Sequence, residues 1–97
     1  MDSEVNSIKI TVNKKYVLLG YAIQEILLEN ELIDARPKDL MELLIKKGFF
    51  KNDHRDGLPL RNILRELDKR NELYLIPQVR VERKDKNRFW YFNPVQL

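Results

Sequence analysis

The sequence contains no cysteine, and this absence excludes several classes of protein. Without thiols there is neither a disulfide framework nor thiolate chemistry, which favours a reducing compartment. The first residues, 1–4, lack the basic and apolar segments of a secretory signal. The apolar stretch over 16–28 is too short to span a bilayer, and it contains Gln24 and Glu25. We therefore expect a cytoplasmic protein, or a nuclear one in a eukaryote.

Glycine, serine and histidine are also scarce. Three glycines leave no glycine-rich loop that binds phosphate. Both serines, Ser3 and Ser7, lie far along the chain from His54, the single histidine, so no Ser/His/acid set is visible. A chain of 97 residues also has little room for a deep pocket. We expect no enzymatic activity, no small-molecule substrate and no cofactor.

One loop holds residue types that bind metals, namely Asp53, His54 and Asp56. No second cluster of ligands accompanies them, and real sites combine such clusters at defined spacings. The sequence therefore predicts a solvated loop here and no metal site.

The composition is that of one globular domain over residues 1–97, with 43% hydrophobic and 34% charged residues. The net charge of +3 is unevenly distributed. Residues 1–48 hold seven basic and eight acidic side chains, whereas residues 49–97 hold eleven and seven. Five of the basic residues fall between Gln78 and Phe92. Such a local excess is typical of a nucleic-acid footprint, and a solvated turn at a sheet edge is the alternative.

Hydrophobic periodicity predicts two elements in the first third of the chain. Alternating apolar residues at Ile8, Ile10 and Val12 predict a half-buried strand over 7–13. The period then changes, and a helix is expected over about 16–30. Its main apolar stripe is Leu19, Ala22, Ile23, Ile26 and Leu27. A second stripe, Leu18, Tyr21 and Leu28, requires further cover from the N-terminal strand or from another subunit.

Proline and glycine delimit the next two helices. Pro37 opens a helix over about 37–47, and Gly48 ends it. After a polar loop, Pro59 opens a third helix over about 59–71. Its apolar stripe is Leu60, Ile63, Leu64 and Leu67, and its opposite face carries Asn62, Arg65, Glu66 and Lys69.

The last segment predicts a β-hairpin over about 77–93, with a charged turn over 84–87. Trp90 and Phe92 share one face of their strand and are expected in the core, whereas Phe89 and Tyr91 share the other. A base-stacking platform is the alternative role for these aromatic residues.

The predicted order of strand, three helices and hairpin is an α+β arrangement. Over 16–92 it resembles the winged helix-turn-helix family, most closely in Pro37–Leu40 at the start of the second helix and in 60–67 as the third. Residues 79–81 and 90–92 would be the wing strands. The long loop between the second and third helices resembles HARE-type variants of that family. The N-terminal strand is an addition to the minimal family pattern.

The resemblance implies a double-stranded DNA-binding module, either a small transcriptional regulator or an accessory nucleic-acid module. In this family the third helix enters the major groove, and the wing contacts the backbone or the minor groove. Arginine and asparagine can each hydrogen-bond twice to a base edge, and cations neutralise phosphates. The implied DNA contacts are Asn62, Arg65 and Lys69 on the helix, and Arg83, Lys84, Lys86 and Arg88 on the wing. Three acids in or beside this face, Glu66, Asp68 and Glu72, repel phosphates.

A protein-interaction module without nucleic-acid binding is the alternative function, because fold does not fix function. It would use the second stripe of the first helix, or the free edge of the N-terminal strand, to form a homodimer or to bind another protein. The third-helix face would then be a solvated surface with internal ion pairs such as Glu66–Arg70. Neither function involves a membrane.

Overall fold

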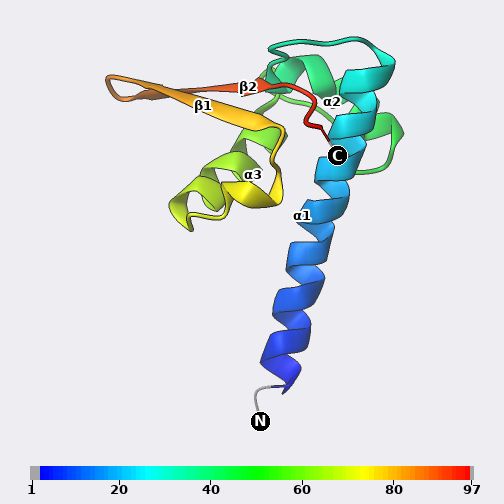
Figure 1. Ribbon diagram of the computed structural model, residues 1–97, viewed down its shortest axis with the longest axis vertical. Helices are drawn as coiled ribbons and strands as arrows, with labels where there is room; N and C mark the ends of the chain where they lie inside the picture. Colours follow the sequence, from blue (N-terminus) through cyan, green and yellow to red (C-terminus); the bar gives the residue numbers. More distant parts are fainter. Residues whose placement is uncertain (1–2, 97) are drawn as a thin grey trace.

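The computed structural model describes the backbone of residues 3–96 and the side chains of residues 13–96. It is a mixed α+β structure of three α-helices and a two-stranded antiparallel hairpin (Figure 1). The elements in order are α1 (Ser3–Glu29), α2 (Pro37–Lys46), α3 (Leu58–Lys69), the 3-10 turn η1 (Leu73–Leu75), β1 (Val79–Lys84) and β2 (Asn87–Phe92).

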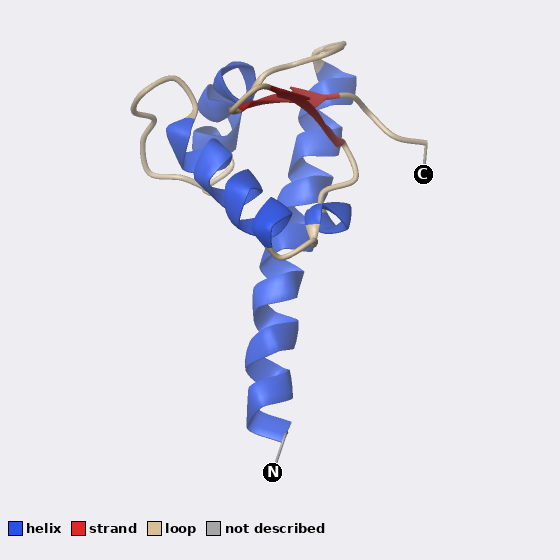
Figure 2. Ribbon diagram, turned by 90° about the vertical axis from the view of Figure 1, so that its left-hand side faces the viewer, coloured by secondary structure: helices blue, strands red, loops and turns tan. Residues whose placement is uncertain are grey.

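The predicted N-terminal strand over 7–13 is wrong, because these residues are the first half of the long helix α1. A strand needs a partner edge, whereas a helix that is already nucleated extends at little cost. No proline or glycine lies between Ser3 and Tyr16 to stop that extension. Val5, Ile8 and Val12 are also spaced by three and four residues, so the segment carries a helical period as well. The first half of α1 extends away from the rest of the molecule (Figure 2).

The other helices lie close to their predicted bounds. Pro37 is the first residue of α2, and Gly48 follows the end of that helix with φ +88°. The Gly48 N–H donates to the Ile45 carbonyl (2.9 Å) and the Phe49 N–H donates to the Leu44 carbonyl (3.0 Å). These two hydrogen bonds form the Schellman motif, which supplies donors to carbonyl groups at the end of a helix. The motif requires a residue with left-handed backbone, which glycine adopts readily.

The core lies where the three helices and one face of the hairpin meet. Its fully buried members include Ile23, Ile26 and Leu27 of α1, Leu40, Met41 and Leu44 of α2, Leu60, Leu64 and Leu67 of α3, and Phe92 of β2. Trp90 is also buried, which confirms the prediction that Trp90 and Phe92 share the core face of β2. Phe89 is exposed and Tyr91 is half-buried.

One edge of β2 is held to the connector between α1 and α2. The hairpin register pairs Val79 with Phe92 and Lys84 with Asn87, so the turn lies in the predicted charged segment. Phe92 pairs on its other side with Ala35, in the connector between α1 and α2, through two backbone hydrogen bonds of 3.0 and 2.7 Å. The base of the hairpin is therefore fixed, and its tip extends outward (Figure 1).

A buried amide ties the C-terminal segment to α1. The Gln24 Nε2 donates to the Val95 carbonyl (2.7 Å), and its Oε1 accepts from the Val95 N–H (2.9 Å) and from Gln78 Nε2 (3.2 Å). The side-chain amide of Gln24 thus bonds to both the N–H and the carbonyl of Val95, as the backbone of a neighbouring strand would. The Gln24 side chain is itself buried.

Candidate nucleic-acid interface

A groove of about 800 Å³ lies between the start of α2, the first half of α3 and strand β2. Six basic residues from these elements line it: Arg36 and Lys38 from the α2 start, Arg61 and Arg65 from α3, and Lys86 and Arg88 from the hairpin. Among its lining residues the single acid is Asp56. The groove thus gathers positive charge from three separate parts of the chain on one concave surface.

Close packing of the loop before α3 against the start of α2 brings two walls of the groove together. Gly57 precedes α3 with φ +91°, and a Cβ atom there would lie 2.7 Å from the Lys38 nitrogen. The Asp53 Oδ1 accepts a hydrogen bond from the Gly57 N–H (2.8 Å), and Arg61 donates to the Arg55 carbonyl (2.6 Å). These contacts hold Arg36 and Lys38 near Arg61, so the groove depends on a position that only glycine occupies without strain.

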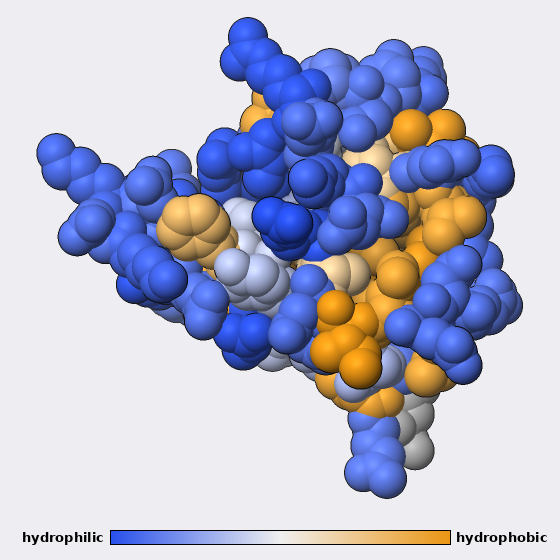
Figure 3. Space-filling view, turned by 90° about the horizontal axis from the view of Figure 1, so that it is seen from above, coloured by the Kyte–Doolittle hydropathy of each residue, from blue (hydrophilic) through white to orange (hydrophobic). Residues whose placement is uncertain are grey.

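The structure brings together three of the seven residues implied as DNA contacts. Arg65, Lys86 and Arg88 line the groove. Asn62 and Lys69 are exposed on α3 outside it, and Lys84 is exposed at the end of β1. Seen from above, hydrophilic side chains predominate on the projecting hairpin (Figure 3).

Arg36, Lys38 and Arg61 were missed as site residues by the sequence reasoning. Arg36 and Lys38 belong to the half of the chain in which acids outnumber bases, so charge counting along the sequence passes over them. Only the packing of α2 against α3 places them opposite the hairpin. A local signal existed, since both flank Pro37 at a helix start.

Arg83 and Arg88 project from the inner face of the hairpin toward the end of α3, where both contact Asp68. Two parallel hydrogen bonds of 2.8 and 3.0 Å run from Arg83 to the Asp68 carboxylate, and Arg88 donates a third of 2.8 Å. The Asp68 side chain is 11% exposed. The bonds from Arg83 lower the pKa of Asp68, and together with those from Arg88 they outweigh burial, which raises it. Asp68 therefore offsets part of the positive charge of the hairpin.

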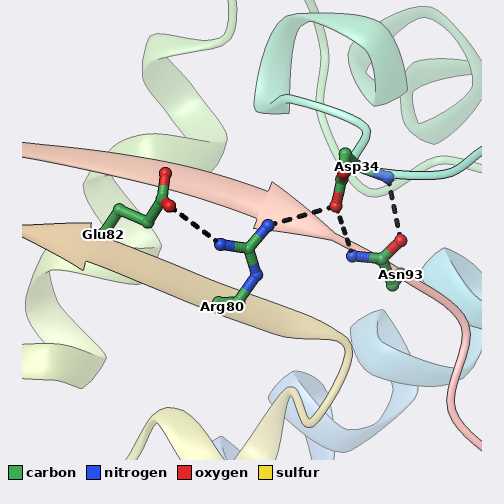
Figure 4. A network of polar contacts seen from close by, with 4 residues as sticks. All are labelled: Asp34, Arg80, Glu82 and Asn93. Atoms are coloured by element: carbon green, nitrogen blue, oxygen red, sulfur yellow. Dashed lines mark hydrogen bonds and ion pairs between the residues drawn. The ribbon is translucent and has the colours of Figure 1, made fainter.

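A second polar network holds the outer face of the hairpin to the connector between α1 and α2 (Figure 4). The Arg80 guanidinium donates to Asp34 (3.1 Å), lies 3.2 Å from a Glu82 carboxylate oxygen, and stacks over the Tyr91 ring at 4.9 Å. Asn93 donates to Asp34 from its side-chain amide (2.8 Å) and accepts from the Asp34 N–H (2.8 Å). Hydrogen bonds from Asn93 and Arg80 lower the pKa of Asp34.

The aromatic run of β2 also contributes to the groove. Phe89, Trp90 and Tyr91 all line it, and the Phe89 ring is 42% exposed. The exposed Phe89 side chain offers an apolar surface to a sugar or a base. The Arg88 guanidinium lies 5.8 Å from the centre of the Trp90 ring.

The loop with metal-binding residue types does not form a metal cluster. The Asp53 carboxylate accepts a hydrogen bond from the Gly57 N–H, and His54 hydrogen-bonds to the Asn52 side chain (3.0 Å). Over the part of the chain that the structure describes, no three His, Cys, Asp or Glu residues converge as metal ligands. In the same residues, no helix has the length and apolar character needed to cross a membrane.

No protein-family model matches this sequence, and comparisons with curated proteins and with solved structures give no significant match.

Proposed function

We propose that the protein binds double-stranded DNA through the basic groove, as a winged-helix module. The observation that carries the proposal is the convergence of six basic side chains from α2, α3 and the hairpin around a single acid. Cations on a concave surface release the counterions of nucleic-acid phosphates, which gives affinity without sequence preference.

The arrangement of elements supports the winged-helix assignment. Two helices, a third amphipathic helix and a fixed hairpin follow in the order of that family. The groove lies between α3 and the hairpin, the two elements that contact DNA in the family. The α3 residues Asn62 and Lys69 are exposed beside it and extend the surface that would meet a duplex.

Some basic side chains of the groove are already bonded to other groups of the protein, and others are free to bind phosphate. Arg88 is paired with Asp68, and Arg61 donates to a backbone carbonyl. Among the described residues, none holds Arg65 or Lys86 in an ion pair. We therefore expect Arg65 and Lys86 to contribute most to phosphate binding.

Charge reversal tests the proposal. The double variant Arg65→Glu/Lys86→Glu is compared with Lys46→Glu/Lys51→Glu, which makes the same charge change at two exposed positions outside the groove, by fluorescence anisotropy on a short random-sequence duplex. The groove variant is expected to lose binding, and Lys46→Glu/Lys51→Glu is expected to retain it. Equal affinities of the two variants would contradict the proposal.

A protein-interaction module is the second candidate function. It is favoured by the exposure of Leu18, Tyr21 and Leu28, which form a second apolar stripe on α1 beside the buried one. The two candidate functions predict different effects of charge reversal at Lys84 and Lys86 on the hairpin. If the protein binds DNA through the groove, these substitutions should abolish binding to a duplex. If the protein instead binds a protein partner through α1, the same substitutions should leave that interaction unchanged.

A further inference from the structure

One face of α1 is apolar and uncovered in the described part of the chain. Leu18, Tyr21 and Leu28 are 49%, 59% and 57% exposed. They lie on the same helix as the buried Ile23, Ile26 and Leu27 but on another side of it. A surface helix normally has one apolar stripe, so a second stripe indicates a second contact.

The spacing of this face is that of a helix pair. Five exposed residues follow one another at intervals of four, three, four and three: Lys14, Leu18, Tyr21, Glu25 and Leu28. Residues at these intervals form the seam along which two helices pack side by side. The seam spans about 21 Å, at 1.5 Å for each residue.

The charges along the seam fix the direction of the partner helix. The end of the seam nearer the N-terminus carries Lys14 and Lys15, and the other end carries Glu25 and Glu29, all exposed. Glu25 already pairs with Lys47 (Nζ–Oε1 3.1 Å), so Glu29 is the acid that would meet a partner helix. A parallel copy of α1 would place lysine against lysine and glutamate against glutamate. An antiparallel copy centred near Tyr21 places Lys14 beside Glu29 of the other copy, because the two positions are nearly equidistant from Tyr21.

We propose that two copies of the chain pair in an antiparallel manner through this face of α1, with Tyr21 near the two-fold axis. In such an isologous interface, Leu28 of one copy packs on the aliphatic stems of Lys14 and Lys15 of the other. No residue of α1 lines the basic groove. The substitutions in α1 that test the pairing therefore leave the side chains of the groove unchanged.

Sedimentation equilibrium of the full chain tests the pairing itself. The wild type is expected to dimerise, and Leu18→Ser/Leu28→Ser is expected to raise the dissociation constant at least about a hundredfold, since each dimer buries four of these side chains. Phe89→Ser is the matched control, because it removes an exposed apolar side chain from the hairpin. Far-UV circular dichroism establishes that each variant is folded. A wild type that stays monomeric at about 1 mM overturns the proposal.

A charge swap tests the antiparallel direction. Lys14→Glu places two glutamates together at each end of an antiparallel pair, and Glu29→Lys places two lysines together, so each single variant weakens the dimer. The double variant restores opposite charges and regains the wild-type dissociation constant. Lys51→Glu makes the same charge change in the loop before α3 and is expected to have no effect. Failure of the double variant to recover overturns the antiparallel arrangement, whatever the outcome for DNA binding.

Discussion

Asp68 and Arg83 form a two-pronged ion pair, with Nη–Oδ distances of 2.8 and 3.0 Å, which joins the last turn of α3 to strand β1. Arg88 reaches the same carboxylate from β2. The sequence marks Asp68 as an acid that would repel phosphates. In the structure it also holds the hairpin against the helix, and it occupies two of the arginines implied as wing contacts with DNA.

Replacing this carboxylate is expected to strengthen DNA binding. In Asp68→Asn, Arg83 and Arg88 lose their anionic partner and become available to phosphates. Each arginine freed steepens the dependence of log K on log salt by about 0.9. Anisotropy titrations of wild type and Asp68→Asn over a series of salt concentrations measure the difference. An unchanged slope would show that neither arginine reaches DNA.

The ion pairs of the hairpin also predict how stability depends on pH. Asp34 and Asp68 both have pKa values below the ordinary 3.8, because hydrogen bonds favour their charged forms. A lowered pKa in the folded state contributes stability above the unfolded-state value, and this is lost as pH falls through the folded value. The free energy of unfolding should therefore decline below about pH 4. Urea denaturation of Asp68→Asn should show a smaller decline over the same range, and an equal decline would exclude Asp68 as a cause.

Gly57 is expected to be intolerant of any side chain. In Gly57→Ala the new Cβ atom would lie 2.7 Å from the backbone nitrogen of Lys38 and 2.9 Å from the carbonyl carbon of Pro37. The alanine would also have to adopt a left-handed backbone conformation, at φ +91°. Gly48→Ala is a matched control, because its φ of +88° is nearly the same and nothing lies within 4 Å of the added Cβ. The control should lose about 1 kcal/mol and Gly57→Ala clearly more, as measured by thermal or chemical denaturation. Equal losses would mean that the start of α2 moves away freely.

Gln24 offers a test of how the C-terminal segment is held. Gln24→Leu keeps the volume of the side chain but removes its hydrogen bonds to the Val95 backbone and to Gln78. Leaving these buried groups without a partner costs about 1–3 kcal/mol each, unless water replaces the amide. The expected result is a lower free energy of unfolding, with faster amide hydrogen exchange at Val95. Unchanged exchange there would show that the segment is held by other contacts.

Local signals in the sequence sufficed for much of the fold. Pro37 and Gly48 delimit α2 because each has a backbone preference that acts within one turn. The alternation of Trp90 and Phe92 with Phe89 and Tyr91 likewise separates buried from exposed sides of β2. These features depend on neighbours in sequence, which a reader of the sequence can see.

Features that depend on distant residues were not accessible in the same way. The segment over 7–13 carries a strand period and a helix period together, and only the continuity of α1 decides between them. Arg36 and Lys38 line the same groove as hairpin residues about fifty positions away in the sequence, and no local sequence pattern predicts that proximity. For the same reason, the pairing of Asp68 with Arg83 and Arg88 follows only from the packing of the hairpin on α3.

Binding of the purified wild-type protein to a random-sequence duplex, compared at about 50 and 200 mM salt, tests the central claim most directly. With the four unengaged cations of the groove reaching phosphates, the dissociation constant should lie near the micromolar range at the lower salt and rise on the order of a hundredfold at the higher. Absence of binding at the lower salt, or binding that does not change with salt, would contradict a groove that recognises DNA by its phosphates.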